Sequence, residues 1–250
     1  MSASNGKGHG MHSPFVFEFI QKVLNDRTNY AAYAAVENCR QQLLNDQTIL
    51  EVEDFGAGTS SGKGKQRSVA SIAKNAAKPA KFGQLLYRIV KYYQPQTILE
   101  LGTSLGITTA YLSLARPESK LVTMEGAQAI AAKARQNFAS LHLQNVLLAE
   151  GNFDQSLPTV LDQLPSLDLV FVDGNHRREP TVAYFNHLLA RTHNNSILIF
   201  DDIHWSLEME QAWSTIQRHP SVRCSIDLFF IGIVLFRQEF MEKQDFIIRF

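Results

Sequence analysis

The chain has 250 residues, 45% of them hydrophobic and 19% charged, which suffices for one large domain with a buried core. Its 24 basic and 24 acidic side chains give a formal net charge of zero, so no global field points to nucleic acid or a membrane surface. No apolar run approaches the roughly 18 residues of a membrane span, and the N-terminus lacks the apolar core of a signal peptide. We therefore expect a cytoplasmic protein whose two cysteines, Cys39 and Cys224, are reduced and buried.

The first 95 residues are predicted to be mostly helical. Helices are expected over residues 14–24, 30–45, 69–77 and 82–93, with Ser13 as N-cap and Pro14 at the first position of the first helix. His9 and His12 precede them, with no acid or thiol nearby to complete a metal site.

The loop between the second and third helices, residues 49–68, contains EDFGAGTSSGKGK. A phosphate loop reads G-x-x-x-x-G-K-[ST], but Ala57 stands here at the first glycine and Gly64 at the hydroxyl residue. A nucleotide-binding glycine turn should be followed, about 20 residues further on, by a strand that ends in an acid. No such strand is predicted after this segment. We expect a solvated loop, or a mobile lid over a bound ligand.

From residue 96 onward, predicted strands alternate with predicted helices. Strands are expected at 97–101, 120–124, 145–149, 167–172, 196–200, 222–230 and 232–238, and helices at 107–115, 127–140, 155–163, 179–191 and 206–218. The last two apolar runs are too close for a helical crossover, so they must form an antiparallel hairpin. The pattern predicts an α/β protein with a Rossmann-like, doubly wound, seven-stranded sheet whose last strand is antiparallel.

The most informative segment is Thr97–Ala115, TILELGTSLGITTAYLSLA. It reads as a strand, a glycine turn from Gly102 to Gly106 and a helix, the unit that places a nucleotide-like ligand at a helix N-terminus. Glu125 ends the next apolar run, 23 residues after Gly102, where a carboxylate can bind both hydroxyls of a ribose.

Two ligand classes suit this arrangement, dinucleotides and S-adenosylmethionine. Dinucleotide sites favour G-x-G-x-x-G, because a pyrophosphate must approach bare backbone. Here the turn is Gly-Thr-Ser-Leu-Gly, and Glu100 lies two residues before it. An acid at that position would repel a pyrophosphate and suit the cationic amino-acid end of S-adenosylmethionine.

The residues E-L-G-T-S-L-G, with M-E-G downstream, resemble motif I and the following acidic motif of class I S-adenosylmethionine-dependent methyltransferases. The resemblance covers residues 80–238 and includes the antiparallel seventh strand. It implies a helical N-terminal extension or lid over residues 1–80 and an S-adenosylmethionine-binding methyltransferase domain over residues 81–250.

Ligands of open α/β sheets bind at the carboxyl ends of the strands, so the residues that follow each strand are the candidate site. The cofactor-binding candidates are Glu100, Gly102, Thr103, Ser104 and Gly106 for the methionine portion, Glu125 and Gly126 for the ribose, Gly151, Asn152 and Phe153 for the adenine, and Asp173.

Three further acids, Asp173, Asp201 and Asp202, follow the fourth and fifth strands. Carboxylates this close need a proton or a cation between them, and oxygen ligands suit Mg²⁺, Mn²⁺ or Ca²⁺. Their arrangement resembles the metal site of cation-dependent O-methyltransferases of the catechol and caffeoyl-coenzyme A type. The chain departs from that pattern at Asp202, where the family has Asn, and at His176, where it has a Lys base.

The sequence therefore predicts methyl transfer from S-adenosylmethionine to the hydroxyl of a small molecule. A divalent cation is a candidate to assist this transfer. His176 is the candidate base, His204 the second candidate, and Asp173 the third catalytic residue. An NAD(P)-dependent oxidoreductase and a non-catalytic S-adenosylmethionine-binding protein are the alternatives. We expect a small-molecule acceptor and neither nucleic acid nor membrane as partner, and a homodimer remains open.

Overall fold

The computed structural model describes residues 13–52, 66–76 and 79–250. The chain divides into two compact units. Unit 1 comprises residues 1–26, 97–99 and 157–250, and unit 2 comprises residues 27–96 and 100–156. This division follows contacts within the chain. The predicted boundary at residue 80, between a helical extension and a cofactor-binding domain, stays a prediction.

The main sheet has eight strands in the order β10-β8-β9-β7-β6-β3-β4-β5. The strands are β3 (Thr97–Leu101), β4 (Lys120–Glu125), β5 (Val146–Glu150), β6 (Leu169–Val172), β7 (Ile197–Asp201), β8 (Cys224–Asp227), β9 (Ile231–Leu235) and β10 (Gln244–Ile247). The α/β class and the antiparallel strand β9 are confirmed. The predicted number of strands was one too few, because β10 adds parallel to β8.

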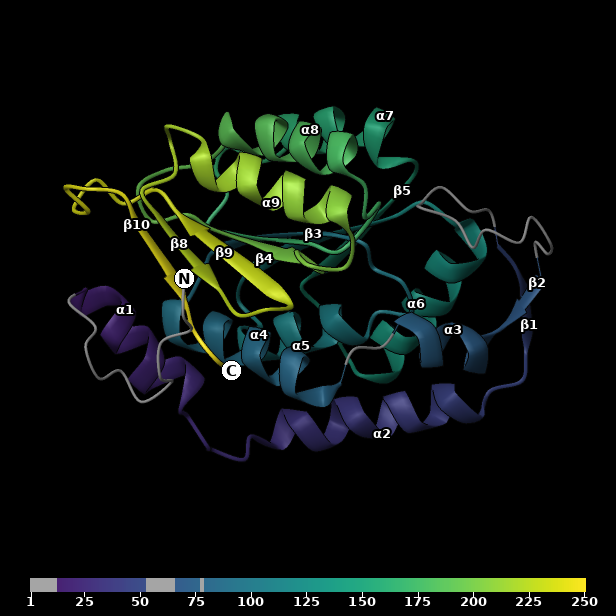
Figure 1. The fold of residues 1–250 in the computed structure, drawn as a ribbon. Coiled ribbons are helices and arrows are strands. Elements are labelled where there is room, and N and C mark those ends of the chain that lie inside the picture. Colours follow the sequence, from purple (N-terminus) through teal and green to yellow (C-terminus); the bar gives the residue numbers. More distant parts are fainter. Residues whose placement is uncertain (1–12, 53–65, 77–78) are drawn as a thin grey trace. The chain divides into compact units, whose positions relative to one another are not determined.

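In unit 1, strands β6 and β7 are parallel, and every residue of both is buried. Helices α8 (Arg178–Leu189) and α9 (Leu207–Arg218) pack against each other, side by side in Figure 1. The hairpin turn lies at residues 228–230, earlier than predicted, and Gly232 is inside β9. Phe229 provides the positive φ of 71° in this turn, and Gly232 is needed for packing, because a Cβ there would lie 2.7 Å from the Trp213 ring of α9.

In unit 2, strand β5 pairs in parallel with β4 and is only half-buried. Helices α4 (Ala80–Tyr93), α5 (Ile107–Ala115) and α2 (Ala31–Asn45) pack together, with α3 (Val69–Ala76) against α2. The Tyr111 hydroxyl of α5 donates a 2.7 Å hydrogen bond to the Glu37 carboxylate of α2. Helix α6 (Gln128–Ser140) follows β4, and α7 (Phe153–Asp162) follows β5.

The described residues among the first 95 are mostly helical, as predicted, but with two differences. The first predicted helix is α1 (Pro14–Phe19) continued by a π-helical turn, η1 (Ile20–Leu24). A short antiparallel pair, β1 (Ile49–Glu51) and β2 (Gln66–Ser68), was not predicted, because three-residue strands carry too little alternation to detect.

The candidate lid at Gly56–Lys65 and the histidines His9 and His12 lie outside the described residues. Within the described part of the chain, no helix combines the length and apolar character needed to cross a bilayer. Both cysteines are buried and free, as expected.

Candidate functional site

The glycine turn after β3 has the backbone conformation that its sequence predicts. Gly102 and Gly106 have φ angles of 108° and 81°, in the left-handed region that favours glycine. A Cβ at Gly106 would overlap the Phe138 ring of α6. The need for glycine at position 106 is therefore conformational and steric.

The backbone amides of this turn are engaged inside unit 2. The N–H groups of Gly102 and Thr103 both donate to the Met124 carbonyl at 3.0 Å, and that of Gly106 donates to the Thr103 carbonyl at 2.9 Å. The Ser104 N–H donates to the Glu125 carboxylate at 2.8 Å. A pyrophosphate cradle needs free N–H groups, which these four residues do not offer in this conformation.

Glu125 ends β4 with a fixed and partly exposed carboxylate. Oε2 accepts from Ser104, and Oε1 accepts from the Ala127 N–H at 2.9 Å. Burial raises the pKa of Glu125, while hydrogen bonds from backbone groups, including that of Gly126, act against this rise. Each carboxylate oxygen keeps accepting capacity, so the geometry fits the predicted contact with a ribose diol.

Glu100 lies in a buried cluster of hydroxyl groups. Its Oε2 accepts hydrogen bonds from the hydroxyls of Thr109 at 2.5 Å and Thr123 at 2.6 Å. The Thr103 hydroxyl lies 2.6 Å from that of Thr123 and extends the chain of hydrogen bonds. The other carboxyl oxygen, Oε1, is buried without a hydrogen-bond partner.

This environment changes the interpretation of Glu100. The residue has no exposed surface, so its carboxyl cannot touch a bound methionine group in this conformation. Burial raises its pKa to about 7, and the two threonine hydroxyls only partly offset that rise. Glu100 instead ties α5 to β4 through Thr109 and Thr123.

The residues after β5, predicted to flank adenine, form the start of α7. Gly151 continues the sheet by donating its N–H to the Glu125 carbonyl at 2.9 Å. Asn152 is occupied in part by capping, because its Oδ1 accepts from the Asp154 N–H at 2.9 Å. Phe153 is half-buried. Gly151 therefore lies beside Glu125, and the role of Gly151, Asn152 and Phe153 at the adenine stays a prediction.

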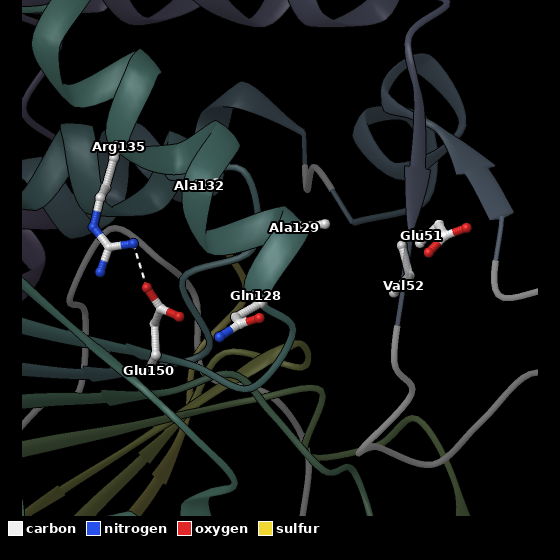
Figure 2. Close-up of a pocket in the computed structure, with 7 residues that line it drawn as sticks. All are labelled: Glu51, Val52, Gln128, Ala129, Ala132, Arg135 and Glu150. Carbon is white, nitrogen blue, oxygen red and sulfur yellow. Dashed lines mark hydrogen bonds and ion pairs between the residues drawn. The ribbon is translucent and has the colours of Figure 1, made fainter.

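A cavity of about 600 Å³ opens in unit 2 beside α6 (Figure 2). An ion pair between Arg135 of α6 and Glu150 of β5 lines one side. The lining also contains Glu51, Val52, Gln128, Ala129 and Ala132. It includes Glu150 but none of the three residues predicted to flank adenine.

In unit 1, the structure brings together three of the predicted residues at the ends of β6 and β7. His176 Nε2 lies 3.5 Å from Asp173 Oδ1 and 4.0 Å from Asp202 Oδ2. The loop that carries His176 is held by Asn175, whose side chain accepts from Arg177 Nε at 2.8 Å. All three clustered side chains keep some solvent exposure.

The expected metal site is not supported by this arrangement. Among the described residues, no group of three or more histidine, cysteine or acidic side chains is placed to hold an ion. His176 Nε2 lies between the carboxylates of Asp173 and Asp202, at 3.5 Å and 4.0 Å, so the imidazole occupies the space between these two acids. Asp201 is 2% exposed and ends β7. The metal therefore stays a prediction.

His204 forms a separate pair. Its Nε2 lies 2.8 Å from Asp227 Oδ2, and its Nδ1 lies 3.5 Å from Glu210 Oε1. The buried Asp227 is itself fixed, because its Oδ1 accepts from the Phe229 N–H at 2.8 Å. Asp227 orients His204, and the sequence analysis missed it because the predicted strand 222–230 ran past the residue. Strand β8 instead ends at Asp227, which places this acid at a strand end like the other candidate residues.

Large apolar side chains closely follow His204 and Asp227 in the sequence and are exposed at the surface of unit 1. The exposed fractions are 74% for Trp205, 71% for Leu207, 46% for Phe229 and 54% for Phe230. The two loops that carry them meet through a 3.4 Å hydrogen bond from the Ile203 N–H to the Phe230 carbonyl. We call the three aromatic members of this group, Trp205, Phe229 and Phe230, the aromatic patch. Exposed large apolar side chains grouped on neighbouring loops are typical of a binding surface.

Solved structures of methyltransferases share this fold. An S-adenosylhomocysteine-bound methyltransferase of Podospora anserina matches 87% of the chain over 92% of its own length, with 15% identity and a TM-score of 0.62. The O-methyltransferase TomG of Streptomyces achromogenes, in complex with S-adenosylmethionine, matches 84% of the chain over 91% of its own, with 18% identity and a TM-score of 0.60. The chain therefore shares the α/β fold of these methyltransferases, as the resemblance seen in ELGTSLG and MEG predicts.

Two sequence comparisons also match this chain to methyltransferases. Residues 99–203 match a family model described as a methyltransferase domain. The chain is 27% identical over 124 residues to the catechol O-methyltransferase of Niastella koreensis, a match that covers 48% of the chain and 55% of that protein. The chain therefore spans about half the length of this curated relative.

Proposed function

We propose that the protein is a methyltransferase that moves the methyl group of S-adenosylmethionine to a hydroxyl group of a small, flat, apolar acceptor. The observation that carries this proposal is Glu125, whose carboxylate is fixed at the end of β4 by the N–H groups of Ser104 and Ala127. A fixed carboxylate beside a glycine turn suits a ribose diol.

The same turn favours S-adenosylmethionine over a dinucleotide. The amides of Gly102, Thr103, Ser104 and Gly106 are all used inside unit 2, so they offer no donors to a pyrophosphate. The ligand of such a turn should carry no phosphate, and S-adenosylmethionine carries none. This argument replaces the one based on Glu100, because Glu100 is fully buried.

The residues of the chain then have the following roles. Glu125 binds the ribose, Gly151, Asn152 and Phe153 flank the adenine, and the turn from Gly102 to Gly106 lies along the methionine portion. When bound, S-adenosylmethionine supplies the methyl group on a sulfonium, and the protein supplies alignment and a base. His176, between Asp173 and Asp202, takes the acceptor proton, and His204 is the second candidate.

The aromatic patch supports a flat apolar acceptor. Trp205 follows His204 directly, and Phe229 hydrogen-bonds the carboxylate that orients His204. Aromatic faces bind planar rings by stacking, and their exposure leaves them available. The relative from N. koreensis is a catechol O-methyltransferase, and we extend that acceptor class, ring hydroxyls, to this chain.

Two measurements test the proposal. Calorimetry should show that S-adenosylhomocysteine binds and that NAD and NADP do not; the reverse result would identify an oxidoreductase. A methyl-transfer screen of phenols, sugars and carboxylates, with and without Mg²⁺ and with EDTA, should find activity on phenols. Binding of S-adenosylhomocysteine without turnover of any acceptor would favour the non-catalytic alternative, and the EDTA arm decides whether a cation takes part.

A further inference from the structure

A cavity of about 680 Å³ lies in unit 1 at the edge of the sheet where β7 and β8 begin. The register places the first residues of β7 and β8, Ile197 and Cys224, beside Leu235 at the end of β9. Three loops therefore meet there. The lining residues are Thr192, His193, Asn194, Pro220, Ser221, Arg223, Phe236, Gln238 and Met241. Asp202, which follows the last residue of β7, belongs to the opposite edge.

Arg223 gives this cavity an uncompensated positive charge. Its guanidinium Nη2 donates to the carbonyls of Phe240 at 3.1 Å and Met241 at 3.4 Å, and Nε is enclosed without a hydrogen-bond partner. Carbonyl oxygens orient the group but do not neutralise it. Within residues 13–52, 66–76 and 79–250, Arg223 forms no ion pair, and no acidic side chain lines the cavity.

Two neutral side chains of the lining add hydrogen-bond donors to those of Arg223. His193 and Asn194 are already engaged, His193 with Asp168 at 2.8 Å and Asn194 with Glu239 at 2.9 Å. The Ser221 hydroxyl and the Gln238 side-chain amide, in contrast, have no hydrogen-bond partner among the described side chains or backbone. An arginine, a hydroxyl and an amide together form the donor set that recognises carboxylates and phosphates.

We propose that this cavity is a second small-molecule site of the protein and that it binds an organic anion, a carboxylate or phosphate on an apolar body. Arg223, Ser221 and Gln238 bind the anionic group. Phe236, Pro220 and the largely exposed Met241 provide the apolar wall. The site shares no residue with the groups assigned to methyl transfer, so it stands or falls independently of the proposed function.

Calorimetric titration tests this site with three probes: inorganic phosphate, hexanoate and, as the uncharged control, hexanol. The wild-type protein should bind at least one of the two anions saturably below about 20 mM, and hexanol at least tenfold more weakly. Arg223→Gln should weaken anion binding about tenfold or more, and Ser221→Ala about threefold. Arg249→Gln, which removes the same charge from an exposed position outside the cavity, should bind like the wild type.

The outcome of the probes also identifies the anionic group. Competition between phosphate and hexanoate indicates a shared oxyanion site, and binding of one alone assigns the ligand class. If Arg223→Gln does not fold, Ser221→Ala and Gln238→Ala, each checked by its melting curve, decide the question. The proposal is overturned if neither anion saturates the wild-type protein, if Arg249→Gln weakens binding as much as Arg223→Gln, or if folded Ser221→Ala and Gln238→Ala both bind unchanged.

Discussion

Replacing Glu100 by glutamine should remove a pH dependence from the stability of the protein. Burial raises the pKa of the Glu100 carboxyl from its ordinary 4.5 to about 7. The folded protein therefore holds this proton more tightly than the unfolded chain does. The resulting stabilisation is complete below pH 4.5 and is lost as the pH rises through 7. At about 1.4 kcal/mol per pKa unit, the loss reaches about 3 kcal/mol in total.

Urea unfolding of the wild type and Glu100→Gln at several pH values between 5 and 8 measures this effect. From pH 5 to pH 8, the difference in unfolding free energy, variant minus wild type, should increase by about 2–3 kcal/mol. The cost of burying the amide shifts this difference equally at every pH, so it does not affect the increase. Glu118→Gln, at an exposed position, serves as the matched control and should show no such change. Parallel pH profiles for the wild type and Glu100→Gln would refute the assignment of a protonated, buried Glu100.

Three further predictions concern the cofactor turn and the acceptor. Glu125→Gln should weaken S-adenosylhomocysteine binding by about 1–3 kcal/mol in calorimetry, because two ribose hydroxyls lose a charged partner, whereas the exposed Glu118→Gln should not; equal affinities would remove Glu125 from the site. Gly106→Ala should lower the unfolding free energy by about 2 kcal/mol or more, through its positive φ and overlap with Phe138, while Gly126→Ala, without a positive φ, should cost less; comparable urea midpoints would contradict this. Trp205→Ala should raise the KM for a phenolic acceptor roughly fivefold or more and leave S-adenosylhomocysteine affinity unchanged; an effect of the same size from Phe17→Ala, on α1, would argue against the patch.

The fold could be predicted from the sequence wherever local signals were strong. Helix α5 occupies the predicted residues 107–115, because a glycine turn precedes it and its apolar face is continuous. The antiparallel hairpin was predictable because two apolar runs stood too close for a crossover. Strand β10, with the sequence QDFI, has neither a long apolar run nor a clear alternation, so its place in the sheet follows only from tertiary pairing with β8.

The site was predictable in its positions and less so in its interactions. Glu125, Asp173, His176 and Asp202 could be selected from the sequence because each follows or ends a predicted strand. Ligands of open α/β sheets bind at the carboxyl ends of parallel strands. The partners of Glu100 could not be found, because Thr109 and Thr123 lie 9 and 23 residues away and carry no pattern of their own. A motif shows where a side chain lies, and burial decides whether a ligand can reach it.

Strand β10 also protects the sheet against association with other chains. Without it, the backbone N–H and C=O groups of β8 would form an open edge, a ready template for pairing with a strand from another molecule. Four register pairs, from Gln244 with Cys224 to Ile247 with Asp227, occupy that edge. Strand β10 then becomes the edge of the sheet itself, and its four residues, which include Gln244 and Asp245, make that edge short and partly polar, two features that disfavour pairing with another chain. Variants that loosen this strand should lose solubility before they lose the fold.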